Sequence, residues 1–303
     1  MSVLIVGSVA LDSVESPAGS VKEALGGAAT YASIAARTLH DDVAIVGVVG
    51  DDFPEEHVRL LEQRGVNLTG LERAPGRTFR WAGRYHEDTS QRDTLDTQLN
   101  VFAHFSPRIP PELRAAELLF LANIDPELQL SVLDQVDDPQ MVFCDTMNFW
   151  IQGKRNKVLA VLARSDVAFL NDEEARMLTG QPSLLRAASA VQALGPSHVI
   201  IKKGPHGAEL HSPEGVFYCP AFPVPNAADP TGAGDAFAGG VIGHLAEAGE
   251  DSDEEMRRAV VVGTVVASYC VEGFSMSGLL RAGPVTVRER YEELQRMSAI
   301  PEP

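Results

Sequence analysis

Short apolar runs alternate with helical segments along most of this chain, and this alternation constrains the fold more than any other feature. VLIVG at residues 3–7 and VAIVGVVG at residues 43–50 are typical of buried strands, and each is followed by apolar residues at helical spacing. The same order returns after residue 116 in ELLFLANID, MVFCDTMNFW and SDVAFLNDEEARMLTG. Strands that alternate with helices form a parallel sheet covered by helices. The sequence therefore predicts an α/β fold with a doubly wound, mainly parallel sheet and helices on both faces.

The segment between Pro75 and Pro107 does not follow this alternation. It reads as two extended, largely polar stretches around the turn-like HEDTSQ. Polar strands do not suit a buried core, so we expect them to form a small β-sheet with residues 12–25 at the edge of the main sheet. The predicted organisation is a single domain over residues 1–303, with inserted lid segments at about 12–25 and 76–105. Such a sheet can close over a substrate, join two subunits as a homodimer, do both, or do neither.

Charge and composition exclude several function classes. The net charge is −17, whereas nucleic acids and anionic membranes attract basic surfaces. The N-terminal MSVLIVGSVALDSV lacks the positive region and the long apolar stretch of a signal peptide or membrane anchor. Cys144, Cys219 and Cys270 lie far apart among apolar neighbours, which is typical of reduced core cysteines. We therefore expect a cytoplasmic protein that acts on a small molecule.

The stretch DPTGAGDAFAGG, residues 229–240, has the composition of a binding loop at the start of a helix. Gly232, Ala233 and Gly234 precede an apolar run with helical spacing, so their backbone N–H groups are expected to point outward without partners. Such a helix start binds phosphate or another anion. Asp235 follows directly, and its carboxylate can either cap the helix or take a proton from an attacking hydroxyl.

Polar residues also follow other predicted strands, where ligands bind in parallel sheets. Asp12 follows the first strand, and Asn148 follows MVFCD and is a candidate substrate ligand. Asn171 and Glu174 follow a later strand, where they either contribute to a site or simply form a capping box. The chain has no GxxxxGK[ST], HExxH, CxxC or GxGxxG motif, which argues against a P-loop enzyme, a zinc hydrolase, a thioredoxin-like protein and a Rossmann dehydrogenase.

Five stretches, in matching order along the whole chain, resemble the motifs of PfkB-type carbohydrate kinases, which have the ribokinase-like fold. DPTGAGDAFAGG looks like the C-terminal signature DTxGAGD, the most specific of the five. GSVALD resembles the first strand with its substrate-binding acid, and LGGAATYAS resembles the N-terminal glycine signature. NDEEA is similar to the NxxE motif and KKGPHG to the nucleotide loop. The resemblance implies an ATP-dependent kinase that phosphorylates a hydroxyl of a small sugar or polyol.

The resemblance also implies a role for each motif. Asp235 would be the general base, and Gly232, Ala233 and Gly234 would form the anion hole for the transferred phosphoryl group. ATP and Mg²⁺ would be the cofactors, and K⁺ is an open question. The other implied contacts are Asp12, Gly26, Gly27 and Tyr31 for substrate, Asn171, Lys202, Lys203, Gly204 and Gly207 for nucleotide, Asn171 and Glu174 for Mg²⁺ through water, and Asp229 and Thr231, with residues 272–275, for a monovalent cation.

Three positions depart from the family pattern. Tyr31 stands where the N-terminal signature normally has Asn, and a phenol lacks the paired donor and acceptor of an amide, so we expect a substrate that differs from ribose. Lys202 stands where Thr is common, which would replace a hydroxyl contact to phosphate by a charge. Pro230 in place of Thr is a milder change, because only the backbone is needed there.

Two other functions stay open at the level of sequence. A nucleoside kinase of the same fold is suggested by Tyr31, Trp81 and Tyr85, whose rings could stack on a base. A protein of a different class, a catalytically silent nucleotide or sugar sensor, would need no base, and the intact Asp235 argues against it. Neither the substrate nor the phosphorylated hydroxyl follows from these motifs.

Overall fold

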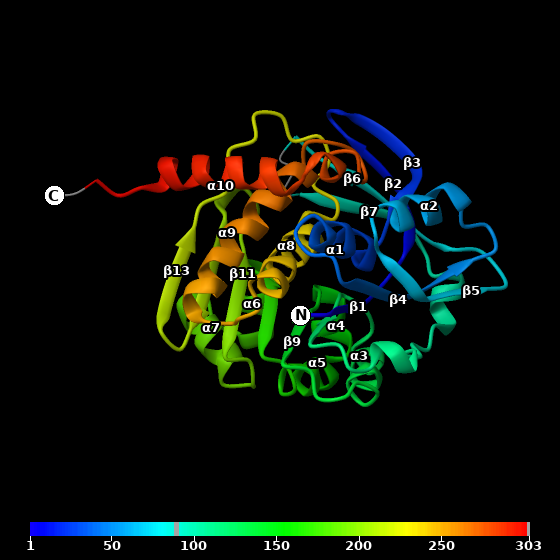
Figure 1. Ribbon diagram of the computed structural model, residues 1–303, viewed down its shortest axis with the longest axis horizontal. Coiled ribbons are helices and arrows are strands. Elements are labelled where there is room, and N and C mark those ends of the chain that lie inside the picture. Colours follow the sequence, from blue (N-terminus) through cyan, green and yellow to red (C-terminus); the bar gives the residue numbers. More distant parts are fainter. Residues whose placement is uncertain (88–90, 302–303) are drawn as a thin grey trace.

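A nine-stranded sheet forms the centre of the computed structural model, which describes residues 1–87 and 91–301 (Figure 1). The strands from β5 to β11 pair in parallel, and the last two strands continue the sheet as an antiparallel hairpin. This confirms the predicted doubly wound, mainly parallel sheet. The strand order is β13 (Gly215–Cys219), β12 (Ala208–Ser212), β11 (His198–Lys202), β10 (Val167–Asn171), β9 (Met141–Asp145), β8 (Leu118–Leu121), β1 (Val3–Val6), β4 (Val43–Gly50) and β5 (Asn67–Ala74).

Helices cover both faces of this sheet, because successive strand residues point to opposite sides. In β1, Ile5 packs into one apolar core, whereas Leu4 and Val6 pack into the other. The first core is covered by α1 (Ala28–Arg37), α2 (Glu55–Gln63), α8 (Ala233–Ala248), α9 (Asp253–Cys270) and α10 (Pro284–Ser298). The second is covered by α3 (Pro126–Leu133), α4 (Asn148–Gly153), α5 (Arg155–Leu162), α6 (Asp172–Thr179) and α7 (Leu184–Gln192).

A separate four-stranded sheet contains the predicted lid segments (Figure 1). Its central pair, β2 and β6, is parallel, and the outer strands β3 and β7 pair antiparallel to them. The turn predicted at HEDTSQ includes residues 88–90, which lie outside the described residues. The order is β3 (Gly19–Gly26), β2 (Ala10–Ser16), β6 (Phe79–Tyr85) and β7 (Arg92–Gln98).

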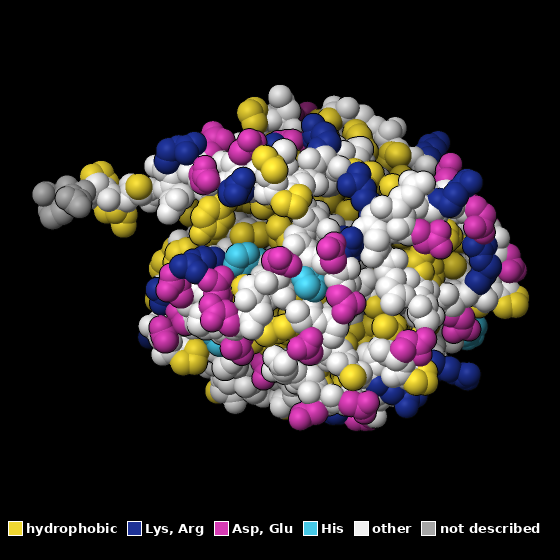
Figure 2. Space-filling model, viewed as in Figure 1, with side chains coloured by type: hydrophobic (Ala, Val, Ile, Leu, Met, Phe, Trp, Pro, Cys, Tyr) yellow, Lys and Arg dark blue, Asp and Glu magenta, His cyan; other side chains and the backbone are white. Residues whose placement is uncertain are grey.

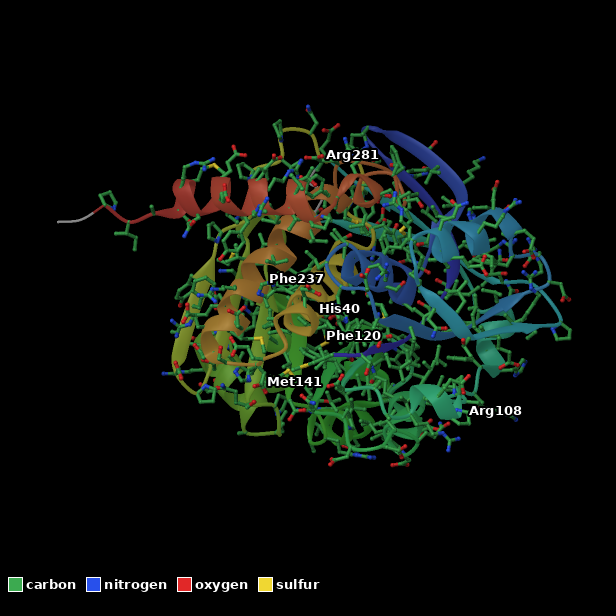
Figure 3. All side chains as sticks on the ribbon, viewed as in Figure 1. His40, Arg108, Phe120, Met141, Phe237 and Arg281 are labelled. Atoms are coloured by element: carbon green, nitrogen blue, oxygen red, sulfur yellow. The ribbon has the colours of Figure 1, made fainter. Side chains whose placement is uncertain are left out.

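An aromatic cluster links the central sheet to the beginning of α8. The rings of Phe120 and Phe237, labelled in Figure 3, both meet Phe169 edge to face, with centroids 5.8 and 6.2 Å away. Phe143 stacks on Phe169 at 6.2 Å. Such buried aromatic contacts stabilise a packing arrangement beyond the area they bury. They hold the N-terminal half of α8 above the sheet, next to the strand ends.

Acidic side chains spread over the face of the molecule shown in Figure 2, with Lys and Arg side chains among them. No helix of the described residues is long and apolar enough to cross a membrane.

Candidate active site

Two predicted site residues, Asn171 and Lys202, and one further acid, Asp145, meet where parallel strands end. Asp145 ends β9, Asn171 ends β10 and Lys202 ends β11. Asn171 and Lys202 are neighbours in the sheet register, and Lys202 Nζ lies 2.6 Å from Asp145 Oδ2. The start of α8 lies beside them, since a Cβ added to Gly234 would be 3.3 Å from Lys202 Nζ. Strand ends and helix start therefore form one site.

The glycine-rich turn before α8 has a backbone that other residues would disturb. Gly232 adopts a left-handed conformation with φ 75°, and a Cβ there would collide with the ring of Tyr31. The N–H groups of Gly232 and Gly234 have no hydrogen-bond acceptor within the part of the chain that the structure describes. The N–H of Ala233 instead donates to the Pro230 carbonyl at 3.1 Å. The expectation of three unpartnered N–H groups is therefore wrong for Ala233, because its hydrogen bond to the Pro230 carbonyl closes the turn.

Asp235 lies partly buried in the first turn of α8. Burial raises the pKa of its carboxyl to about 7, and the neighbouring charge of Asp145 also raises it. The charges of Lys202 and Arg92 act in the opposite direction. A carboxylate with a pKa near neutrality suits proton transfer at physiological pH. At this position a carboxylate lies next to two free N–H groups.

The lid contributes a second acid to the site. Asp12 is 6% exposed, and burial raises its pKa to about 7, although the Gly27 N–H donates to its carboxylate. Gly26 leaves room for that carboxylate, because a Cβ there would collide with Asp12 Oδ2. Gly27 has φ 95° and lies against the backbone of Ser8, whose hydroxyl accepts from the Ala28 N–H at 3.0 Å. These two glycines thus have packing reasons to be small; their substrate contacts stay a prediction.

Tyr31 is 2% exposed, and its ring lies under the glycine turn of α8. Burial raises the pKa of its hydroxyl well above the usual range, and the charges of Asp12 and Asp235 add to this effect. The Tyr31 ring packs directly against Gly232. Direct contact between Tyr31 and a substrate stays a prediction.

Asn171 and Glu174 form a capping box at the start of α6. Asn171 Oδ1 accepts from the Glu174 N–H and Glu174 Oε2 accepts from the Asn171 N–H, both at 2.7 Å. Burial raises the pKa of Glu174 to about 7, and Asp145 raises it further, whereas Lys202 lowers it. Two carboxylates thus share one lysine, which fits a site where a divalent cation supplies the missing positive charge. Within residues 1–87 and 91–301, no cluster of three His, Cys, Asp or Glu could hold a metal ion by itself.

The nucleotide-loop motif follows β11. Lys203 Nζ lies 2.8 Å from the buried Glu209 carboxylate and 5.6 Å from the centre of the Tyr218 ring. Gly204 and Gly207 both have positive φ, 54° and 87°, and a Cβ on Gly207 would collide with the Cys219 carbonyl. The motif therefore turns tightly against β13, and its contact with a nucleotide is not tested by this structure.

Of the two residues predicted to hold a monovalent cation, Asp229 contacts Ser275, and Thr231 contacts Asp229. Asp229 is 1% exposed and accepts from the N–H groups of Thr231, at 2.9 Å, and Ser275, at 3.3 Å. Glu272 faces two arginines, with Arg281 at 3.0 Å and Arg290 at 2.7 Å. A monovalent cation at this loop stays a prediction.

The register of the lid sheet shows which lid side chains share a face. Trp81 lies over Gly83 on the face of β6 that also carries Tyr85, whose hydroxyl is 3.2 Å from Thr231 Oγ1. Arg92 of β7 pairs with Tyr85 in the register and lies 5.1 Å from the centre of the Trp81 ring. On the other face of β6, Arg80 pairs with Glu23 and Asp52, and Arg84 with Glu15.

Three residues near the site were missing from the candidates predicted from sequence. Asp145 ends an apolar strand, and a polar residue at a strand end could have been predicted as a site residue. Arg92 could not be assigned, because the register of β7 was unknown. Asn123, after β8, and the predicted Asn148 each have a buried side-chain oxygen without a hydrogen-bond partner in the described structure. Such an acceptor favours a ligand hydroxyl as its partner.

Comparisons with known proteins agree with this geometry. The pfkB family carbohydrate kinase profile matches residues 3–276. The cytidine kinase of Thermococcus kodakarensis is 29% identical over 247 residues, which cover 80% of this chain and 87% of that protein. The deoxyribokinase of Salmonella typhi is 27% identical over 273 residues, covering 86% and 85%. The structure of a putative ribokinase II from E. coli in complex with ATP and Mg²⁺ superposes with a TM-score of 0.78 at 18% identity, covering 96% of this chain and 99% of the other.

The family match extends over most of the chain and includes the strands, helix starts and lid described above. The chain therefore belongs to the pfkB family of carbohydrate kinases, which are phosphotransferases that act on an alcohol group.

Proposed function

We propose that this protein transfers the γ-phosphoryl group of ATP to a hydroxyl of a small sugar-containing acceptor, with Asp235 as general base. The observation that carries this proposal is the position of Asp235 beside the free N–H groups of Gly232 and Gly234. The acceptor oxygen attacks the γ-phosphorus, its proton passes to Asp235, and the bond from phosphorus to the bridging oxygen breaks to release ADP. The N–H groups of Gly232 and Gly234 stabilise the charge on the transferred phosphoryl oxygens.

ATP and Mg²⁺ are the proposed cofactors, as in the E. coli complex. Asn171 and Glu174 would hold Mg²⁺ through water, since this ion keeps part of its hydration shell. The ion would neutralise charge on the phosphates. The proposed nucleotide contacts are Lys202, the last residue of β11, and Lys203, Gly204 and Gly207 in the turn that follows it.

Asp12, Gly26 and Gly27 are the proposed acceptor contacts, with Asn148 and the support of Tyr31. A buried carboxylate such as Asp12 accepts hydrogen bonds from sugar hydroxyls. The lid would close over the acceptor and exclude water. A homodimer formed through the lid, and a monovalent cation held by Asp229 and Thr231, are further parts of the proposal.

A nucleoside acceptor is the second candidate, and a specific observation favours it. Trp81 lies opposite Asp12 in the register of the lid sheet and shares a face with Tyr85. A base attached to the sugar could stack on this ring. The cytidine kinase relative supports the same reading.

The test is ADP release with a panel of sugars, inositols and nucleosides, for the natural protein and Asp235→Asn. We expect one panel class to exceed the blank, and a loss of about 10²-fold or more in kcat for the variant. Near-full activity of Asp235→Asn would refute the assigned base. Calorimetry that shows ATP binding but no turnover on any substrate would support a silent sensor instead.

A further inference from the structure

Lys202 lies among several charged groups of the site, rather than at its rim. Its side chain is 18% exposed, and Nζ lies 2.6 Å from Asp145 Oδ2, 5.9 Å from the centre of the Phe169 ring and beside Gly234. Asp145 is itself fixed, because its other oxygen accepts from the Thr146 N–H at 2.7 Å. Lys202 is thus a cation held in a defined place next to the helix start that carries the base.

The ion pair with Asp145 leaves part of this ammonium group unused. An ammonium has three N–H donors, and only one acceptor, Asp145 Oδ2, contacts Lys202 within residues 1–87 and 91–301. The other donors can therefore bind a second anionic group, such as a phosphoryl oxygen. The unpaired N–H of Gly234 lies at the same place, so two kinds of donor converge there.

The neighbouring Lys203 does not lie in the same surroundings as Lys202. Lys203, one residue further on, pairs with Glu209 at 2.8 Å and lies over Tyr218. Lys203 lies just beyond the end of β11, and of these two lysines it is Lys202 that lies against Gly234. A cation beside the proposed base lies where the transferred group must be, since the base has to reach the attacking hydroxyl.

We propose that Lys202 binds the γ-phosphoryl group of ATP directly, and that Asp145 holds its ammonium group in position for this contact. The proposal rests on the kinase function proposed above and assigns Lys202 to the transferred phosphoryl group rather than to the nucleotide in general. It predicts that Lys202 distinguishes a nucleoside triphosphate from a diphosphate, because ADP lacks the group that the lysine contacts.

Calorimetry in the presence of Mg²⁺ tests this inference. The two ligands are ADP and AMP-PNP, an ATP analogue whose γ-phosphoryl group is not transferred. We expect Lys202→Met to weaken AMP-PNP binding by about tenfold or more, the size of a charge-assisted hydrogen bond, and ADP binding by less than about threefold. Lys202→Met leaves Asp145 buried without its cation, so the double variant Asp145→Asn/Lys202→Met, which removes both charges, is measured as well. It is expected to show the same selective loss.

The matched control is Lys154→Met, which breaks the ion pairs of Lys154 with Asp125 and Glu127, both 2.6 Å long, and removes none of the close contacts of Gly234. It should leave both affinities unchanged. Equal losses for AMP-PNP and ADP in both Lys202 variants would overturn the inference and reduce the ion pair to a structural role. Failure of the natural protein to bind either nucleotide would instead refute the proposed function.

Discussion

Asp235 holds a proton more tightly in the folded protein than an ordinary carboxyl does, and this has a consequence for stability. Its pKa rises from 3.8 to about 7 on folding, mainly through burial. Because the folded pKa is raised, ionisation destabilises the fold, and this cost grows between pH 4 and 7 and then stays constant. The cost has an upper limit of roughly 4 kcal/mol, from the size of the shift. The proposed general base therefore stands at a position where its ionisation opposes folding.

We predict that Asp235→Asn raises the free energy of unfolding, and that it does so more at pH 8 than at pH 5. The amide has no charge to bury, so the gain should be on the order of 1–4 kcal/mol at pH 8. Urea unfolding at both pH values measures it, with the exposed Glu250→Gln as control. A gain that is the same at both pH values would contradict the raised pKa.

The same residue predicts the pH dependence of the reaction. Asp235 must be deprotonated to act as base, so kcat/KM should fall as the pH drops below about 7. Asp145 raises this pKa, while Lys202 and Arg92 lower it. Removal of one cation by Lys202→Met should therefore move the acidic limb to higher pH. A limb that stays in place in a pH series of initial rates would show that another group controls it.

At the level of elements, the two faces of β6 have different neighbours. Trp81 lies on the face of Asp12, Tyr85 and Arg92, whereas Arg84 lies on the opposite face with Glu15 at 2.8 Å. We predict that Trp81→Ala raises the KM for the acceptor by about tenfold, as expected for a lost stacking contact, with little change in the KM for ATP.

Arg84→Ala is the matched control on the same strand, since exposed ion pairs contribute little to stability. Initial rates at varied acceptor and fixed ATP measure both variants. A similar KM for Trp81→Ala and the natural protein would show that the ring does not contact the acceptor.

Local patterns predicted the elements better than their contacts. VLIVG and the later apolar runs predicted strands, because their periodicity is local, and the glycines before Ala28 and Ala233 predicted helix starts. The strand NLTGLERA was not predicted, because its burial is mixed and Gly70 interrupts it. The Lys202 pair with Asp145 joins the ends of β11 and β9, which β10 separates in the sheet, so only the tertiary structure could reveal it.

On the scale of the whole molecule, negative charge gathers where a negatively charged substrate must bind. The net charge is −17, and Asp12, Asp145, Glu174 and Asp235 all lie near the site, with Lys202 and Arg92 as nearby cations. ATP brings further negative charge to this region. We therefore expect a divalent cation to make nucleotide binding favourable, and this dependence should appear in the stability of the entire chain.

We predict that ATP and Mg²⁺ together raise the melting temperature more than the sum of their separate effects, because a ligand that binds only the folded state stabilises it. Glu174→Gln should remove this excess while it keeps the shift seen with ATP alone, since Gln can still accept from the Asn171 N–H in the capping box. Glu173→Gln, an exposed acid in the same turn, is the matched control and should behave like the natural protein. Thermal unfolding with ATP, Mg²⁺ or both measures all three proteins, and an unchanged excess in Glu174→Gln would exclude Glu174 from the magnesium site.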